Sequence, residues 1–178
     1  MHDPSQNRIL VHRIQQAVSR GVAKPIEEEL MSLYRVPIES TSYDNRGKPA
    51  FGLAETALVI AVLWPLVHKF FEPLVTTAGE AFRNRVLETI RKTRHTPSGP
   101  HISVAIQFGD ESDEEFPDTP IRYYFYHQID DEELVKRLKA ADKHLKSLPC
   151  ELFSERSAPV EYGFFWDRET QQWRGCVW

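Results

Sequence analysis

The sequence predicts a single α+β domain in which a mainly antiparallel β-sheet packs against amphipathic helices. Three observations predict this fold class: helical spacing of apolar residues in the N-terminal portion, alternation of apolar and polar residues at 102–108, and two aromatic runs around a turn signal near the C-terminus. The 178 residues are 41% hydrophobic and 27% charged, which is typical of a globular domain and not of a disordered chain. We therefore expect one domain spanning residues 1–178.

The N-terminal portion is predicted to be helical. Between residues 8 and 22, one side of a helical wheel collects the apolar side chains of Ile9, Leu10, Ile14, Ala17 and Val18. A second helix is predicted to begin at Pro25, because proline suits a first turn and the glutamates at 27–29 favour the positive end of the helix dipole. Pro37 is predicted to end this helix.

Residues 39–50 are predicted to form an internal linker or mobile loop between these helices and the rest of the domain. The stretch gathers Ser, Thr, Asp, Asn, Gly and Pro in close succession. Such a composition is typical of an exposed connection.

An apolar run at 51–75 is either a core element or a membrane contact. Its longest uncharged stretch, 56–67, would span about 18 Å as a helix, which is well short of the roughly 30 Å hydrocarbon core of a bilayer. Pro65 would also remove a helical hydrogen bond. We therefore predict a buried central helix, either bent at Pro65 or divided there into two short helices, with a buried strand through 57–63 as the open alternative.

The same run has two exposed interpretations, docking on a partner protein and contact with a membrane. Both would use large apolar side chains near cationic residues. The candidates are Leu63, Trp64, Phe70 and Phe71. The short uncharged length and the prolines disfavour the membrane interpretation.

The segment after this run predicts an amphipathic helix over 78–92. Phe82, Val86 and Ile90 recur at intervals of four residues on one face. Several arginines stand near the carboxyl end, where the helix dipole favours cations. The cationic segment therefore has an ordinary structural explanation.

The C-terminal half predicts two strands, a helix and a hairpin. The strands are expected at 101–108, from alternation, and at 121–127, from an aromatic segment, and they are expected to pair antiparallel. Asp130 is predicted to cap a helix whose buried stripe holds Leu134, Leu138, Ala141, Leu145 and Leu148. The last residues predict a β-hairpin closed at 167–171, where the Asp167 side chain can bond backbone groups two residues on.

Charge and cysteine usage restrict the class of protein. The formal net charge of −4 gives the chain no positive excess for binding nucleic acid, so nucleic acid is not an expected partner. The two cysteines, Cys150 and Cys176, form no C-x-x-C pair or disulfide framework, and the first residues do not read as a secretory signal. We expect two free thiols and a cytoplasmic protein.

Recognisable catalytic and metal-binding motifs are absent from the sequence. It contains no P-loop, no G-x-G-x-x-G, no G-x-S-x-G and no H-E-x-x-H. The acidic stretch at 110–118 lacks the spacing of an EF-hand, and His95, His101 and His127 lack zinc spacing. We expect no metal and no cofactor, and an enzyme that pairs one of the cysteines with a histidine remains an alternative.

Two sets of residues are candidate partner-binding sites. The acidic stretch offers Asp110, Glu111, Asp113, Glu114 and Glu115 to a basic partner. The aromatic segments offer Tyr124, Tyr126, Trp166 and Trp173 on a sheet face that helices leave open, with core packing as the competing interpretation.

These exclusions predict a non-enzymatic protein–protein interaction module, acting as an accessory, adaptor or immunity-type inhibitor component of a larger system. One alternative is a membrane-acting effector that uses the apolar run at 51–75. The other is the enzyme with an unrecognised Cys–His site. The expected partner is another protein, whose identity the sequence does not specify.

Overall fold

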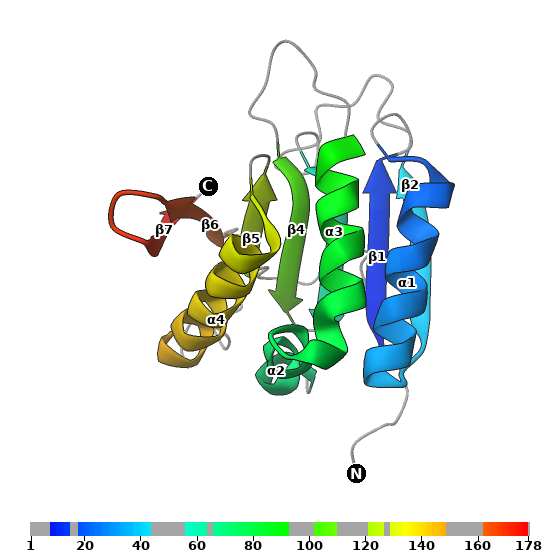
Figure 1. Cartoon of the computed structure of the whole chain (residues 1–178), viewed down its shortest axis with the longest axis horizontal. Helices are drawn as coiled ribbons and strands as arrows, with labels where there is room; N and C mark the ends of the chain where they lie inside the picture. The colour runs from blue at the N-terminus through cyan, green and yellow to red at the C-terminus, as the bar shows by residue number, and fades with distance from the viewer. Residues whose placement is uncertain are drawn as a thin grey trace.

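The computed structural model describes residues 8–14, 18–43, 56–63, 66–92, 102–109, 121–126, 129–148 and 162–177. In this part of the chain, helices cover one face of a seven-stranded sheet (Figure 1). The strands are β1 (Ile9–Ile14), β2 (Ile38–Tyr43), β3 (Thr56–Leu63), β4 (Ile102–Gly109), β5 (Ile121–Tyr126), β6 (Tyr162–Asp167) and β7 (Gln172–Val177). The helices are α1 (Arg20–Tyr34), α2 (Phe71–Leu74), α3 (Glu80–Lys92) and α4 (Asp131–Ser147), with 3₁₀ turns η2 (Leu66–Lys69) and η3 (Thr77–Gly79).

The sheet is mixed, with the strand order β2-β1-β3-β4-β5-β6-β7. The pairs β1/β2, β3/β4 and β5/β6 are parallel, whereas β1/β3, β4/β5 and β6/β7 are antiparallel. Each parallel pair is connected through a helix (α1, α3 or α4), and such crossovers are what parallel neighbours require. The prediction of a mixed α and β domain is confirmed, and the prediction of a mainly antiparallel sheet is wrong.

The first element is a strand, so the predicted helix at 8–22 is wrong. Ile9 and Val11 are fully buried on the helix-covered face and pair with both β2 and β3. Long-range pairing on both sides outweighs the helical spacing of Ile9, Leu10 and Ile14, of which the two isoleucines are β-branched and favour strands. The helix predicted from Pro25 is α1, and it already begins at Arg20.

The predicted linker at 39–50 belongs in part to the sheet. Residues 39–43 lie in β2, parallel to β1 and in regular register with it. Residues 44–50 lie outside the described part of the chain. The Ser- and Thr-rich stretch was assigned to a loop because it lacks apolar residues, and an edge strand needs few of them.

The apolar run contains a central strand instead of the predicted central helix. β3 lies between β1 and β4, and its side chains are buried on both faces of the sheet. A strand buried on both faces is apolar at successive positions and therefore has no alternation to reveal it. The alternative of a strand through 57–63 is confirmed. No helix in the described segments is long and apolar enough to cross a membrane.

Other predicted elements agree with the structure. α3 buries the predicted stripe of Phe82, Val86 and Ile90, and β4 pairs antiparallel with β5. The Asp130 side chain caps α4 by accepting a hydrogen bond from the Glu133 backbone N–H at 2.8 Å. The Asp167 side chain accepts one from the Glu169 backbone N–H at 2.9 Å and so helps to close the β6–β7 hairpin.

Candidate functional site

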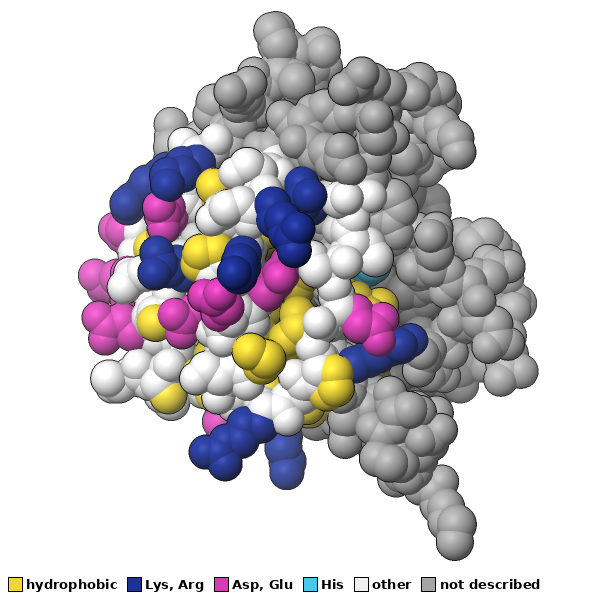
Figure 2. All heavy atoms as spheres, turned by 90° about the vertical axis from the view of Figure 1, so that its right-hand side faces the viewer, with side chains coloured by type: hydrophobic (Ala, Val, Ile, Leu, Met, Phe, Trp, Pro, Cys, Tyr) yellow, Lys and Arg dark blue, Asp and Glu magenta, His cyan; other side chains and the backbone are white. Residues whose placement is uncertain are grey.

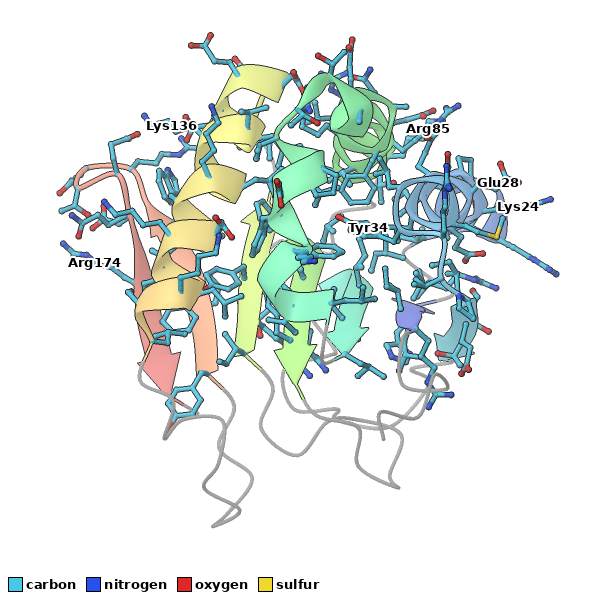
Figure 3. The ribbon with its side chains drawn as sticks, turned by 90° about the horizontal axis from the view of Figure 1, so that it is seen from below. Lys24, Glu28, Tyr34, Arg85, Lys136 and Arg174 are labelled. Carbon is cyan, nitrogen blue, oxygen red and sulfur yellow. The ribbon has the colours of Figure 1, made fainter. Side chains whose placement is uncertain are left out.

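The sheet has one face under the helices and one face turned away from them, which we call the far face. Figure 3 shows the described helices together on one side of the strands. Strand register places one row of far-face residues across all seven strands and a second row beside it. The first row is Thr41, His12, Val59, Ala105, Tyr124, Phe165 and Arg174, and the second is Glu39, Leu10, Ala61, Gln107, Arg122, Gly163 and Cys176.

Strand β2 forms one edge of the sheet and is paired only with β1 among the described strands. Its residues 39–42 are all exposed. The strand contains no proline and no lysine, and its register with β1 shows no bulge over six residues. Proteins often use proline, lysine or a bulge to protect an edge strand from pairing with another chain, and β2 has none of the three.

Three consecutive side chains of β2 form an ion pair or a hydrogen bond with residues of β1, α1 or the residue before β1. The Glu39 carboxylate pairs with Arg8 Nη1 at 2.7 Å, and the Ser40 hydroxyl donates a hydrogen bond to Glu27 Oε1 of α1 at 2.7 Å. Thr41 Oγ1 shares a hydrogen bond with His12 Nδ1 of β1. Because these bonds come from both faces of the sheet, the edge is fixed in an extended conformation.

The backbone of β2 alternates between facing β1 and facing outward. The Ile9 N–H donates to the Pro37 carbonyl at 3.1 Å, so the backbone of residue 37 points toward β1. In a parallel ladder the N–H and C=O groups of one residue point to the same side, and the direction reverses at each residue. The backbone groups of Glu39 and Thr41 therefore also face β1, whereas those of Ile38 and Ser40 face away from the sheet.

The surface around this edge carries mixed charge. Figure 2 looks onto the side of the molecule that carries α1 and β2, where positive and negative side chains are interspersed. The only charged side chain of β2 is Glu39, and Arg8 neutralises it. The edge thus imposes no strong preference for a partner of one sign.

His12 connects the β2 edge to the far face. Its side chain is only 5% exposed. Burial disfavours the imidazolium form and the nearby Arg122 charge adds to this effect, which lowers the pKa of His12 to about 4. The imidazole that bonds Thr41 is therefore neutral at neutral pH.

The far face also carries a buried polar pair at its centre. Gln107 of β4 and Arg122 of β5 are cross-strand neighbours that are 0% and 4% exposed. Arg122 Nε donates a hydrogen bond to Gln107 Oε1. Ala61, which pairs with Gln107 from β3, is small, as is Gly163, which pairs with Arg122 from β6.

The four aromatic candidates do not share one open face. Tyr124 lies on the far face, where it is 2% exposed and stacks on Phe165 with ring centroids 4.8 Å apart. Trp166 and Trp173 lie on the helix-covered face, buried against each other, and Trp173 Nε1 donates to the Arg137 carbonyl of α4. Consecutive residues of a strand point to opposite faces of the sheet, so each aromatic run places some of its side chains in the core and others on the far face. For Tyr126 the structure describes only the backbone, which lies in β5.

The other sequence candidates divide between the core and the segments outside the description. Leu63, Phe70 and Phe71 are buried in the core, so in this fold they form no docking surface for a partner or a membrane. The acidic residues Asp110, Glu111, Asp113, Glu114 and Glu115 and the aromatic Trp64 lie outside the described residues, as do Cys150, His95, His101 and His127. The backbone of Cys176 lies in β7, and its side chain is not described.

Sequence reasoning missed the β2 edge and the Gln107–Arg122 pair. The signal for the edge was the short run 38–43, which contains the β-prone residues Ile38, Thr41 and Tyr43. Gln107 stands on the polar side of the alternation at 102–108, and the sequence does not show that this side is also buried. Within the described residues, no three His, Cys, Asp or Glu side chains are grouped as metal ligands would be.

In comparisons with known proteins, neither a family model, nor a curated protein, nor a solved structure matched this chain.

Proposed function

We propose that this protein is a cytoplasmic, non-enzymatic interaction module that binds an extended segment of a partner protein along the outer edge of β2. In such a complex the partner adds a strand to the sheet, and its backbone bonds the outward groups of Ile38 and Ser40. The module would act as an adaptor or inhibitor component of a larger system. The cytoplasmic location rests on the two cysteines without a disulfide framework.

The observation that carries this proposal is the set of three bonds that hold Glu39, Ser40 and Thr41 from behind. A strand that is already fixed in its extended form loses little conformational entropy when a partner pairs with it. None of these three side-chain bonds uses the outward backbone groups of Ile38 or Ser40. The edge therefore combines preorganisation with accessibility.

Two substitutions at one position test the proposal. Ser40→Pro removes the outward N–H, whereas the matched control Ser40→Ala removes only the hydroxyl that bonds Glu27. Tagged versions are purified from the native host after mild crosslinking. We expect a partner that copurifies with the wild-type protein and with Ser40→Ala, and that is lost with Ser40→Pro.

Hydrogen exchange on the purified complex gives the second measurement. The partner should slow exchange at the amides of Ile38 and Ser40, while the amides of Glu39 and Thr41 are protected with or without it. A partner that binds all three proteins equally and leaves Ile38 and Ser40 unprotected would overturn the proposal. Concentration-dependent dimers that Ser40→Pro abolishes would identify a second copy of this chain as the strand that adds.

A further inference from the structure

Helix α1 lies above the β2 edge. Figure 3 shows α1 over β1 and β2, with Lys24 and Glu28 on the side of the helix that is turned away from the other helices. The Ser40 hydroxyl bonds Glu27 Oε1 at 2.7 Å, so residue 27 of α1 stands level with residue 40 of the edge strand. A strand that pairs with β2 would therefore also lie beside α1.

The outer flank of α1, by which we mean Lys24, Glu28 and Met31, carries a cation, an anion and an apolar side chain in a row. The three residues follow one another at helical spacing and therefore share one face. Met31 is 54% exposed, which no other large hydrophobic side chain among the described residues matches. The ion pair between Lys24 and Glu28 is exposed and long, at 3.7 Å, so both charges remain accessible to a second chain.

A two-fold axis through Ser40, perpendicular to the sheet, pairs the outward backbone of β2 with itself. It places Ser40 opposite Ser40 of a second copy and Ile38 opposite Ser42, in an antiparallel ladder whose opposite residues exchange N–H···O bonds. On the far face it places Glu39 opposite Thr41, so the two Glu39 carboxylates are not direct neighbours. The β2 edge is thus complementary to a second copy of itself.

The same axis sets the two α1 helices side by side and antiparallel. Because α1 lies over β1 and β2, two strand spacings of about 4.8 Å each separate it from the α1 of the second copy, or about 10 Å in all. Packed helices have axes about 8–10 Å apart. The dimer therefore brings the two outer flanks into contact without moving α1 on its sheet.

Charges on the two flanks match in this arrangement. Lys24 lies about 4.5 Å before the level of Glu27 along α1, and Glu28 lies about 1.5 Å beyond it. Each Lys24 therefore stands within about 3 Å, along the helix axis, of the Glu28 of the other copy. It also lies beside the other copy's Glu27, which offsets the repulsion between the two Glu27 carboxylates near the axis. Met31 comes level with the aliphatic stem of the other Lys24, which it can cover.

We propose that the strand added to β2 is the β2 strand of a second copy of this chain, and that α1 packs against α1 across the same two-fold axis. The inference rests on the strand addition proposed above and names the chain that adds. A second copy is favoured over an unrelated chain because this one surface supplies both members of every pair, as a symmetric dimer interface requires. The result is one continuous sheet through both copies.

Sedimentation equilibrium of the purified full chain tests the dimer, from about 1 μM to about 1 mM. We expect a concentration-dependent dimer of the wild-type protein and of Ser40→Ala, and a monomer of Ser40→Pro. Lys24→Glu and Glu28→Lys each place like charges opposite one another across the axis and should each weaken the dimer at least about tenfold. Lys139→Glu is the matched control, because it changes the net charge as Lys24→Glu does at an exposed position of α4, and it should dimerise like the wild type.

Mixing the two charge variants gives the decisive measurement. Lys24→Glu and Glu28→Lys are mixed in equal amounts, with one of them labelled with ¹⁵N so that native mass spectrometry separates mixed dimers from the others. Every pair between the flanks is then of opposite charge, so mixed dimers should form with about the affinity of the wild type. Each chain still lacks its own pair between positions 24 and 28, so only contacts between the copies can restore the dimer.

The proposal is overturned if the wild type stays a monomer up to about 1 mM, if Ser40→Pro dimerises, if either charge variant alone dimerises like the wild type, or if the mixture stays monomeric. These results are separable from those for strand addition itself. A monomeric wild type that still captures another protein, and loses it with Ser40→Pro, keeps strand addition and removes only the second copy. Loss of both the dimer and the Ser40-dependent capture removes both proposals.

Discussion

Arg83 of α3 and Asp131 in the first turn of α4 are joined by two hydrogen bonds, with Nε to Oδ1 at 2.7 Å and Nη2 to Oδ2 at 3.2 Å. Arg83 Nη1 also donates to the carbonyls of Leu74 and Thr76, each at 2.8 Å. One buried guanidinium thus connects α3 and α4 to the end of α2 and the turn that follows it. Its charge is matched by a carboxylate that remains partly exposed.

Replacing Arg83 should therefore cost far more stability than replacing an exposed arginine. Arg83→Met keeps the length of the side chain but leaves two carbonyls and Asp131 without their donor, so we expect a loss of about 3 kcal/mol in the free energy of unfolding. The matched control is Arg85→Met, which breaks only the exposed pair with Glu88 and should cost under about 0.5 kcal/mol. Urea denaturation measures both, and equal losses would refute the role of Arg83.

Proline should cost much less stability at Ser40 than at Thr41. Ser40→Pro removes an outward N–H and is expected to cost less than about 1 kcal/mol relative to Ser40→Ala. Thr41→Pro removes an N–H that faces β1 and should cost about 3 kcal/mol or more. Thermal unfolding of the variants checks the backbone alternation of β2, and a reversed order would show that the strand faces β1 with its even-numbered residues.

The free energy of unfolding should decrease as the pH is lowered, because of His12. The pKa of this residue is about 4 in the folded protein against 6.5 for an unperturbed imidazole, so the unfolded chain binds the proton more tightly. Protonation of His12 therefore does not affect the free energy of unfolding above about pH 6.5. Its destabilising effect grows as the pH falls and is complete below about pH 4. Between pH 7 and 5 it should amount to about 2 kcal/mol.

The His12→Gln variant tests this dependence, because it has no group to titrate at position 12. Urea denaturation at pH 7 and pH 5 should show a smaller loss for the variant than for the wild-type protein. His144 has a pKa that burial also lowers, so His144→Gln is the control for a second histidine with the same sign. Identical pH slopes for wild type and His12→Gln would contradict the prediction.

Two glycines should differ in their tolerance of alanine. A Cβ at Gly79 would lie 2.5 Å from both Leu74 Cα and Pro73 O, which are backbone atoms that cannot move away cheaply. A Cβ at Gly21 would have only Ser19 Oγ nearby, at 3.9 Å. We expect Gly79→Ala to destabilise by about 2 kcal/mol or more and Gly21→Ala to stabilise by about 0.5–1 kcal/mol. Thermal melting of the two variants distinguishes these outcomes by sign.

Elements with a local signal were predictable from the sequence. The four-residue spacing of Phe82, Val86 and Ile90 identifies α3, and Asp130 identifies the start of α4, because both depend on contacts within one or two helical turns. The alternation at 102–108 and the turn at Asp167 likewise act between near neighbours. These signals do not depend on what the rest of the chain does.

Elements without a local signal were misjudged. The apolar spacing of β1 fits a helical wheel, and β3 is apolar at nearly every position, so neither reveals a period of two. Ser40 and Thr41 looked like loop residues because their partners, Glu27 and His12, are brought to them only by folding.

The sequence by itself determined that this protein is a mixed α and β domain with two amphipathic helices, an antiparallel β4/β5 pair and a C-terminal hairpin. Only the tertiary structure decided that half of the strand pairings are parallel, that β2 is a preorganised edge, and that Gln107 and Arg122 meet on the far face. The physical reason is that periodicity, caps and turns are encoded over a few residues. Strand order and cross-strand neighbours depend instead on how distant segments bury their apolar surface together.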